Sequence, residues 1–263
     1  MKLTSLLVLL LLLVGSSCIS RKQITYLQEN ENTRDTIYPI LKKNEPYRLQ
    51  VNDLLSIRTK ALDPDFKDIF NPVGEADPNA TGEERLYYDG FVVNPHGKIR
   101  VPILGELPVL GMTVDEVRED IERRLLADYY KEEANVFVTV KLAGIRYTIA
   151  GEIGGSGSNI IYRDQVSIVE AIANSGGVPL TGDLSDIIVI RQYPTGQKVH
   201  HIDLTSIDAM NSPYYDIKPN DLIIVNPLPQ KTIGTGTTGL QSFTTILSVV
   251  TALTGVILLF IRL

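Results

Sequence analysis

The sequence is poor in cysteine and carries no extended run of positive charge. Its 263 residues include one cysteine, Cys18, so an internal disulfide is excluded. A free thiol, an intermolecular bridge and a lipid attachment point remain open for this residue. The formal net charge is −6 and no stretch of Lys or Arg offers a phosphate track, which argues against nucleic acid as a partner.

Histidine is scarce as well, with three residues in the chain. His96 falls in an expected turn, and the adjacent His200 and His201 would point to opposite faces of a strand. No His/Cys spacing suits a metal ion, and we predict neither a metal nor another cofactor. The composition therefore favours a protein that is not an enzyme, although two carboxylates alone serve many glycosidases.

The N-terminus is typical of a bacterial secretory signal. Lys2 is followed by a short apolar stretch over 6–14 and then by the small residues Gly15-Ser16-Ser17, directly before Cys18. Nine apolar residues are too few to span a membrane. This pattern resembles the lipoprotein box, which predicts a signal peptide over 1–17 and acylation, including palmitate, at Cys18. The alternative is ordinary cleavage near Ser16. In Gram-negative lipoproteins, a residue other than Asp after the cysteine, here Ile19, implies the outer membrane.

A second apolar segment lies at the C-terminus, where no charge occurs between Lys231 and Arg262. A continuous helix over 240–263 would be about 36 Å long, enough to cross roughly 30 Å of hydrocarbon. Small and polar residues would share one face of it: Gln241, Thr244, Thr245, Ser248, Thr251 and Gly255. The stripe predicts either a pore face against other copies or water, or a lone anchor whose hydroxyls bond back to their own helix.

Between the two ends, the polar segment 18–46 is expected to be a periplasmic tether, and 47–142 a first domain. A strand with an Asn52-Asp53 turn inside it is expected over 47–59, and a hairpin over 91–103. Thr113 and Glu116 have capping-box spacing, which predicts that a helix with one apolar face begins there. Another strand is expected over 134–142.

The segment 143–228 is expected to be a second domain. It contains a strand over 146–151, a glycine-rich turn, a helix capped by Ser167 and ended by Gly176-Gly177, and strands over 186–191 and 198–203. No Gly-Lys-Ser/Thr follows the glycine turn, so a phosphate cradle is disfavoured. The segment 217–225 echoes 49–57, with an Asn-Asp turn before a buried strand in both. The fold class is therefore α/β (α+β): two small sheet-plus-helix domains, then a membrane helix within 229–263.

Two stretches carry a family resemblance. YRLQVNDLLSI with VVNPHGKIRVPILGELPVLGMTVDEVREDIERRL resembles the polysaccharide biosynthesis/export domain, with Asn94 where many members have Asp. YTIAGEIGGSGSNIIYRDQVSIVEAIANSGG, followed by IKPNDLIIV, resembles a soluble-ligand-binding β-grasp (SLBB) module, with Ser156 in place of a frequent Pro.

This resemblance implies an outer-membrane translocon of the Wza type for capsular or extracellular polysaccharide. Lipidated copies would form a ring in the periplasm, and their C-terminal helices would form a pore. The implied partners are the polysaccharide cargo and an inner-membrane co-polymerase/tyrosine kinase. A shorter vestibule is expected here, because one β-grasp module stands where longer members have two. The alternatives are a lipid-anchored glycan receptor without a pore and an inner-membrane scaffold.

Overall fold

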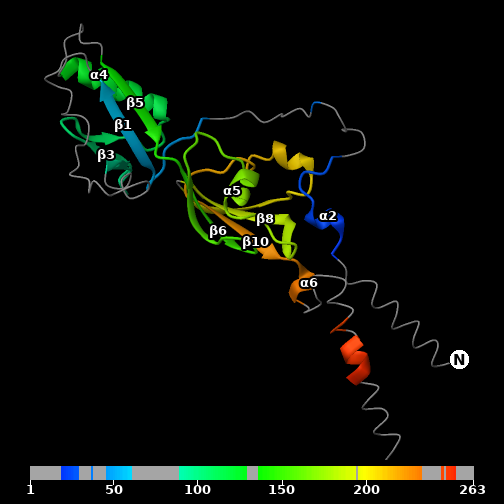
Figure 1. Cartoon of the computed structure of the whole chain (residues 1–263). Coiled ribbons are helices and arrows are strands. Elements are labelled where there is room, and N and C mark those ends of the chain that lie inside the picture. The colour runs from blue at the N-terminus through cyan, green and yellow to red at the C-terminus, as the bar shows by residue number, and fades with distance from the viewer. Residues whose placement is uncertain are drawn as a thin grey trace, which may run out of the picture.

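A computed structural model of the chain describes residues 19–29, 37, 46–60, 89–128, 136–193, 195–232, 244–245 and 247–252. These residues form two consecutive domains, each with a sheet that one helix covers on one face (Figure 1). The mixed α+β class and the pattern of two sheet-plus-helix units agree with the sequence-based expectation.

The first domain is built on an antiparallel sheet in the order β2-β1-β5, namely β1 (Leu54–Lys60), β2 (Phe91–Val92) and β5 (Phe137–Leu142). Helix α4 (Val114–Asp128) covers one face. Because side chains alternate along a strand, every second residue of β1 and β5 faces this helix. The resulting core contains Leu55, Ile57, Val138 and Val140 from the sheet and Val117, Ile121 and Leu125 from α4.

Helix α4 begins with the capping box that its sequence predicts. The Thr113 hydroxyl accepts the Glu116 N–H at 3.1 Å, and the Glu116 carboxylate accepts the Thr113 N–H at 2.8 Å. Two N–H groups that the helix cannot satisfy internally are thereby bonded.

The expected hairpin over 91–103 is wrong in its pairing. The Asn94–Gly97 turn forms, but β2 pairs with β1, whereas β3 (Lys98–Val101) pairs with β4 (Gly105–Pro108). Positive φ angles at Ile103 and Gly105, 66° and 72°, allow the tight turn that folds β4 back onto β3.

The expected strand over 47–59 is also shorter than predicted. β1 begins at Leu54, because Asn52 has a φ of 72° and interrupts the extended backbone.

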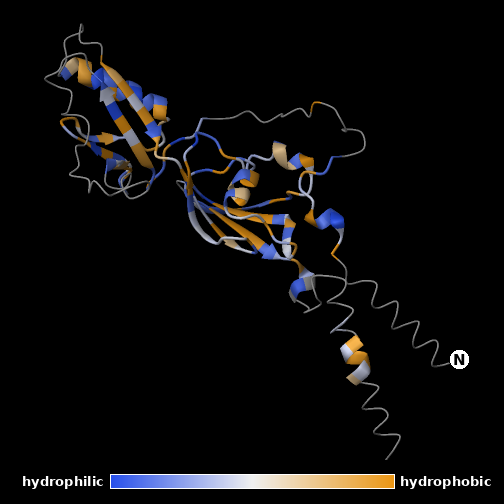
Figure 2. Cartoon of the chain, viewed as in Figure 1, coloured by the Kyte–Doolittle hydropathy of each residue, from blue (hydrophilic) through white to orange (hydrophobic). Residues whose placement is uncertain are grey.

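The second domain is a five-stranded mixed sheet in the order β7-β6-β10-β8-β9, covered on one face by α5 (Ile168–Asn174). Its strands are β6 (Ile145–Gly151), β7 (Gly157–Ile161), β8 (Gly182–Tyr193), β9 (Gly196–Ile202) and β10 (Asp221–Pro227). The first and last strands, β6 and β10, pair in parallel. The capping box at Ser167 and the positive φ at Gly176 and Gly177 confirm the predicted ends of α5. Figure 2 shows the apolar character of β8 and β10.

Part of the segment expected to be a tether packs against the second domain. After α2 (Arg21–Ile24), the Leu27 N–H donates to the Leu204 carbonyl at 2.9 Å and the Gln28 N–H to the Thr205 carbonyl at 2.7 Å. Tyr26 and Leu27 are half-buried against the second core. The N-terminal segment therefore docks on the second domain before the chain enters the first.

The second domain continues into α6 (Pro229–Thr232). Among the residues that the structure describes, every helix is too short or too polar to span a bilayer. Of the helix expected over 240–263, the described residues 244–245 and 247–252 are helical.

Candidate functional site at the domain junction

The junction between the domains is formed by the two Asn-Asp turns that the sequence echo marks. Asn52 and Asn220 adopt positive φ angles of 72° and 65°, which Asn tolerates better than most residues. In each turn the aspartate accepts the N–H three residues earlier: Gln50 N–H to Asp53 at 2.8 Å, and Lys218 N–H to Asp221 at 2.7 Å. The two segments that are similar in sequence therefore also have the same backbone geometry.

The two turns contact each other. The Asn220 amide donates to the second carboxylate oxygen of Asp53 at 3.3 Å. Nearby, the Tyr47 hydroxyl donates to Asp53 at 2.8 Å, and the Lys218 Nζ lies 5.3 Å from the centroid of the Tyr47 ring. This cation–π contact and the Asn220–Asp53 hydrogen bond join the first domain to the second.

Asp53 is buried without a cationic partner among its hydrogen bonds. Burial raises the pKa of its carboxyl to about 6, although the donated Gln50 N–H and Tyr47 hydroxyl act in the opposite direction. Burial, and then the Asp53 charge, raise the pKa of Tyr47. The junction therefore contains a carboxyl that titrates near neutral pH.

Asp221, the equivalent residue in the second turn, is instead paired with a buried arginine. Arg191 Nη2 and Nε donate to Asp221 at 2.7 and 3.0 Å, and the same Nη2 donates to the Asp216 carbonyl at 3.0 Å. Both side chains of the pair are almost fully buried, at 8% and 0% exposure. A buried pair with additional hydrogen bonds fixes the position of this turn.

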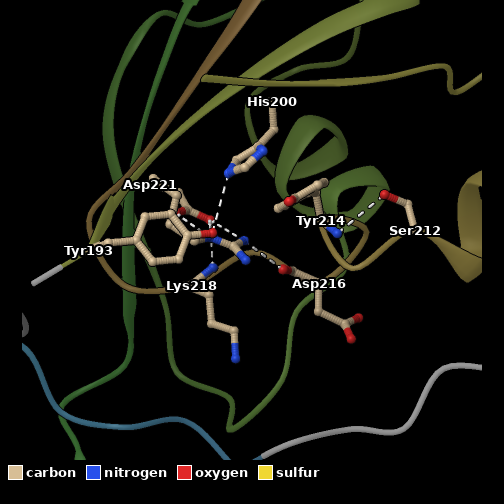
Figure 3. Close-up of polar contacts among 8 residues, drawn as sticks. Tyr193, His200, Ser212, Tyr214, Asp216, Lys218 and Asp221 are labelled. Carbon is tan, nitrogen blue, oxygen red and sulfur yellow. Dashed lines mark hydrogen bonds and ion pairs between the residues drawn. The ribbon is translucent and has the colours of Figure 1, made fainter. Parts of the chain in front are cut away.

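Aromatic rings from β8, β9 and the loop before β10 extend the Arg191 network (Figure 3). The Tyr214 ring stacks on His200 with 3.6 Å between centroids, and Arg191 lies 5.6 Å from the Tyr214 centroid. The Tyr193 hydroxyl hydrogen-bonds His200 Nε2 at 3.2 Å. Burial lowers the pKa of His200, which favours the neutral ring.

The two neighbouring histidines of β9 differ in exposure, and neither belongs to a metal-binding cluster of described residues. His200 is buried and His201 exposed, as expected for neighbours on one strand. Within the described ranges, no three His, Cys, Asp or Glu side chains gather as they would around a metal ion. The polar groups of the Arg191 network bond one another within the second domain, and the Asn220–Asp53 hydrogen bond crosses the junction.

Two cavities flank the junction. One of about 470 Å³ lies between β1, β5 and the turn after β7, and one of about 230 Å³ lies between the two Asn-Asp turns. The linker residues Leu142, Ala143 and Gly144 contribute to both.

Of the membrane-related residues predicted from sequence, the structure describes four. Cys18, Gln241 and Gly255 lie outside the described residues, whereas Thr244, Thr245, Ser248 and Thr251 lie in the helical residues near the C-terminus. The Ser248 hydroxyl donates to the Thr244 carbonyl at 2.5 Å, and the Thr251 hydroxyl donates to the Leu247 carbonyl. These two hydroxyls bond back to their own helix.

Sequence reasoning missed the contact of the two turns and the cavities beside it. The similarity of 217–225 to 49–57 predicted two equivalent turns, but it did not indicate that the two turns contact each other. Tyr47 and Lys218, which face each other across the domains, lie in the two stretches that carry the family resemblance, but the sequence did not indicate their contact.

Comparison with known proteins accounts for both domains. Residues 41–141 match the family described as polysaccharide biosynthesis/export protein, and residues 146–225 match the SLBB domain. The chain therefore carries a polysaccharide export domain and an SLBB module, which supports the family that the resemblance in sequence implied.

The curated relatives are named as export proteins. The chain is 30% identical to an EPS I polysaccharide export outer membrane protein of Ralstonia solanacearum over 58% of this chain and 41% of the relative. It is 25% identical to the Vi polysaccharide export protein of Salmonella typhi over 62% of this chain and 44% of that protein. The chain thus aligns with only about two fifths of the length of these relatives.

Proposed function

We propose that this chain is a subunit of an oligomeric outer-membrane channel that exports capsular or extracellular polysaccharide. In this proposal Cys18 carries the lipid, and both domains lie in the periplasm. The segment 240–263 crosses the outer membrane, with the stripe from Gln241 to Gly255 facing the pore. An inner-membrane co-polymerase/tyrosine kinase delivers the glycan. The relatives, which are polysaccharide export proteins, support export, and the Ralstonia relative supports the outer membrane.

The observation that carries the proposal is that two segments, residues 26–28 after the N-terminus and residues 228–231 at the exit from β10, dock on the same end of the second domain (Figure 1). The N-terminal segment bonds Leu204, whose own N–H donates to Leu184 near the start of β8. The C-terminal side bonds the same region, because the Leu228 N–H donates to the Thr181 carbonyl at 2.7 Å.

Side-chain bonds secure the C-terminal exit further. Glu152 accepts the Thr181 hydroxyl at 2.7 Å and forms an ion pair with Lys231 of α6. A lipid at Cys18, three residues before α2, and a helix that follows α6 would therefore leave the protein on one side. A single membrane could hold both.

The outward face of the second sheet supports assembly into a ring. This face is the one that α5 leaves uncovered. Along β8 and β10 this face carries four half-buried apolar side chains, Ile188, Ile190, Leu222 and Ile224. Beside them, Val199 of β9 is 53% exposed. An apolar patch on a sheet face is typical of a protein–protein contact.

A lipid-anchored glycan receptor without a pore is the second candidate. The back-bonded hydroxyls of Ser248 and Thr251 favour it, because a lone anchor satisfies its polar groups within its own helix.

The mass and shape of the full-length protein in mild detergent distinguish the channel from the receptor. Native mass spectrometry and electron microscopy should reveal a closed ring with an axial opening. A stable monomer or dimer would favour the receptor instead. In cells, deletion of residues 239–263 should leave the two domains folded but abolish surface polysaccharide, and wild-type levels from that deletion would contradict the channel.

A further inference from the structure

The larger cavity at the junction has a cationic lining. Arg58 of β1, Lys141 of β5 and Arg163 after β7 contribute positive charge, whereas Asp164 is the one acid in the described lining. The chain as a whole is acidic, at −6, so this local excess of positive charge is opposite to the overall balance. A volume of about 470 Å³ is in the range of small-ligand sites.

Strand register brings two of the cations together. Arg58 lies opposite Thr139, and Lys141 lies opposite Ser56, so all four share the face of the sheet that points away from α4. Arg58 and Lys141 are thus diagonal neighbours, which in antiparallel sheets are about 7–8 Å apart.

No described ion pair neutralises Arg58 or Lys141. Arg163, in contrast, pairs with Glu170 at 2.9 Å. Two neighbouring cations without an acid between them repel each other, and an anion bound between them would relieve this repulsion.

A tyrosine ring forms another wall of the cavity. Tyr162 is 59% exposed, and its ring lies directly against the linker at Gly144. Gly144 has a φ of +94°, and a Cβ at this position would lie 2.8 Å from Ile160 and 3.1 Å from the Tyr162 ring. Glycine is therefore required for the linker to pass close to the ring, which lines the cavity and remains more than half exposed.

We propose that this cavity binds an acidic sugar residue of the hexuronate class. The sugar carboxylate would lie between Arg58 and Lys141, since guanidinium and ammonium groups form strong charge-assisted hydrogen bonds with carboxylates. The apolar face of the pyranose ring would stack on Tyr162, and the Ser56 and Thr139 hydroxyls would bond ring hydroxyls. The inference rests on the proposed function in so far as the exported glycan supplies the ligand.

Calorimetric titration of the full-length protein in mild detergent tests the site. The probes are trigalacturonate, neutral maltotriose and inorganic phosphate, at low and high salt. Trigalacturonate should bind at least about tenfold more tightly than either of the other two, and more weakly at high salt because added ions screen exposed charges.

Four variants locate the binding. Arg58→Gln and Lys141→Gln should each weaken trigalacturonate binding about tenfold, the loss of one charge-assisted contact. Tyr162→Ala should weaken it as well and leave the charges in place. Lys198→Gln, which removes an exposed cation of β9 away from the cavity, is the matched control and should bind as the wild type does. Circular dichroism checks that all four are folded.

Three results would overturn the site: equal binding of trigalacturonate and maltotriose, equal binding of phosphate, or variants that bind as tightly as the control. These failures are distinguishable from failure of the channel. A ring that lacks uronate binding would refute the cavity alone, whereas a monomer that binds uronate through Arg58 and Lys141 would refute the channel alone.

Discussion

Replacing Asp53 by Asn should abolish a pH dependence of stability that the domain junction creates. Asp53 is 1% exposed, and its carboxylate accepts the Gln50 N–H and the Tyr47 hydroxyl on one oxygen. An asparagine carbonyl can accept the same two bonds, and the Asn220 amide can rotate to present its oxygen to the new NH₂ group. The substitution therefore removes the charge and keeps the shape.

The size of the effect follows from the raised pKa. Burial raises the pKa of Asp53 from 3.8 to about 6 in the folded protein, so folding favours the protonated carboxyl. This contribution to stability is fully present below pH 3.8 and is lost as the pH rises through 6. A shift of about two pKa units corresponds to roughly 3 kcal/mol between the ends of this range.

Denaturant unfolding of the full-length protein in mild detergent, followed by circular dichroism between pH 4 and 8, measures the effect. The free energy of unfolding of the wild type, minus that of Asp53→Asn, should fall by about 2.5 kcal/mol between pH 4 and 8, because a small part of the contribution is already lost at pH 4. Parallel pH profiles of the two proteins would refute the assignment of a buried, titrating carboxyl to the junction.

The equivalent aspartate of the second turn provides the matched comparison. Asp221→Asn leaves the buried Arg191 charge without its counter-ion, so a loss of about 3–5 kcal/mol at pH 7.5 is expected. At the same pH, Asp53→Asn should not destabilise the protein. Similar losses from both substitutions would mean that the two turns do not differ in the way their side-chain partners indicate.

Three further substitutions test other parts of the fold. Tyr147→Phe removes a buried hydroxyl that accepts the Asn174 amide at 3.1 Å, and it should lower the free energy of unfolding by about 1–2 kcal/mol; no change would contradict the buried bond. Gly151→Ala places a Cβ 2.0 Å from the Val225 carbonyl oxygen at a φ of +93°, so thermal denaturation should reveal a loss above about 3 kcal/mol. Ile190→Asp on the open face of the second sheet should leave circular dichroism unchanged and reduce the mass of the particle in detergent, unless this face takes no part in assembly.

Local features of the fold were predictable because local chemistry decides them. Capping-box spacing at Thr113 and Ser167 placed the starts of α4 and α5, since each box involves residues only three positions apart. The Asn-Asp echo predicted the two turns for the same reason, because the asparagine φ and the aspartate hydrogen bonds lie within four residues.

Long-range choices were not predictable in the same way. The strands on either side of the Asn94–Gly97 turn each have an apolar pattern that suits a hairpin. In the structure they do not pair with each other, because β2 pairs with β1 and β3 pairs with β4. The contact of Asn220 with Asp53 and the cationic cavity arise only when residues far apart in sequence come together. The pattern of any one segment contains no information on these partners.

The docking of residues 26–28 on the second domain imposes an order on folding. Leu27 and Gln28 are synthesised early. Their partners, Leu204 and Thr205, are synthesised only after the first domain and most of the second. Contacts between distant parts of a chain form late, because the intervening loop must first be closed. A lipid attached at Cys18 would therefore be joined to a segment that can dock only after Leu204 and Thr205 have been made. A chain cut short before Leu204 could complete its first domain, but it would lack the surface that receives this segment.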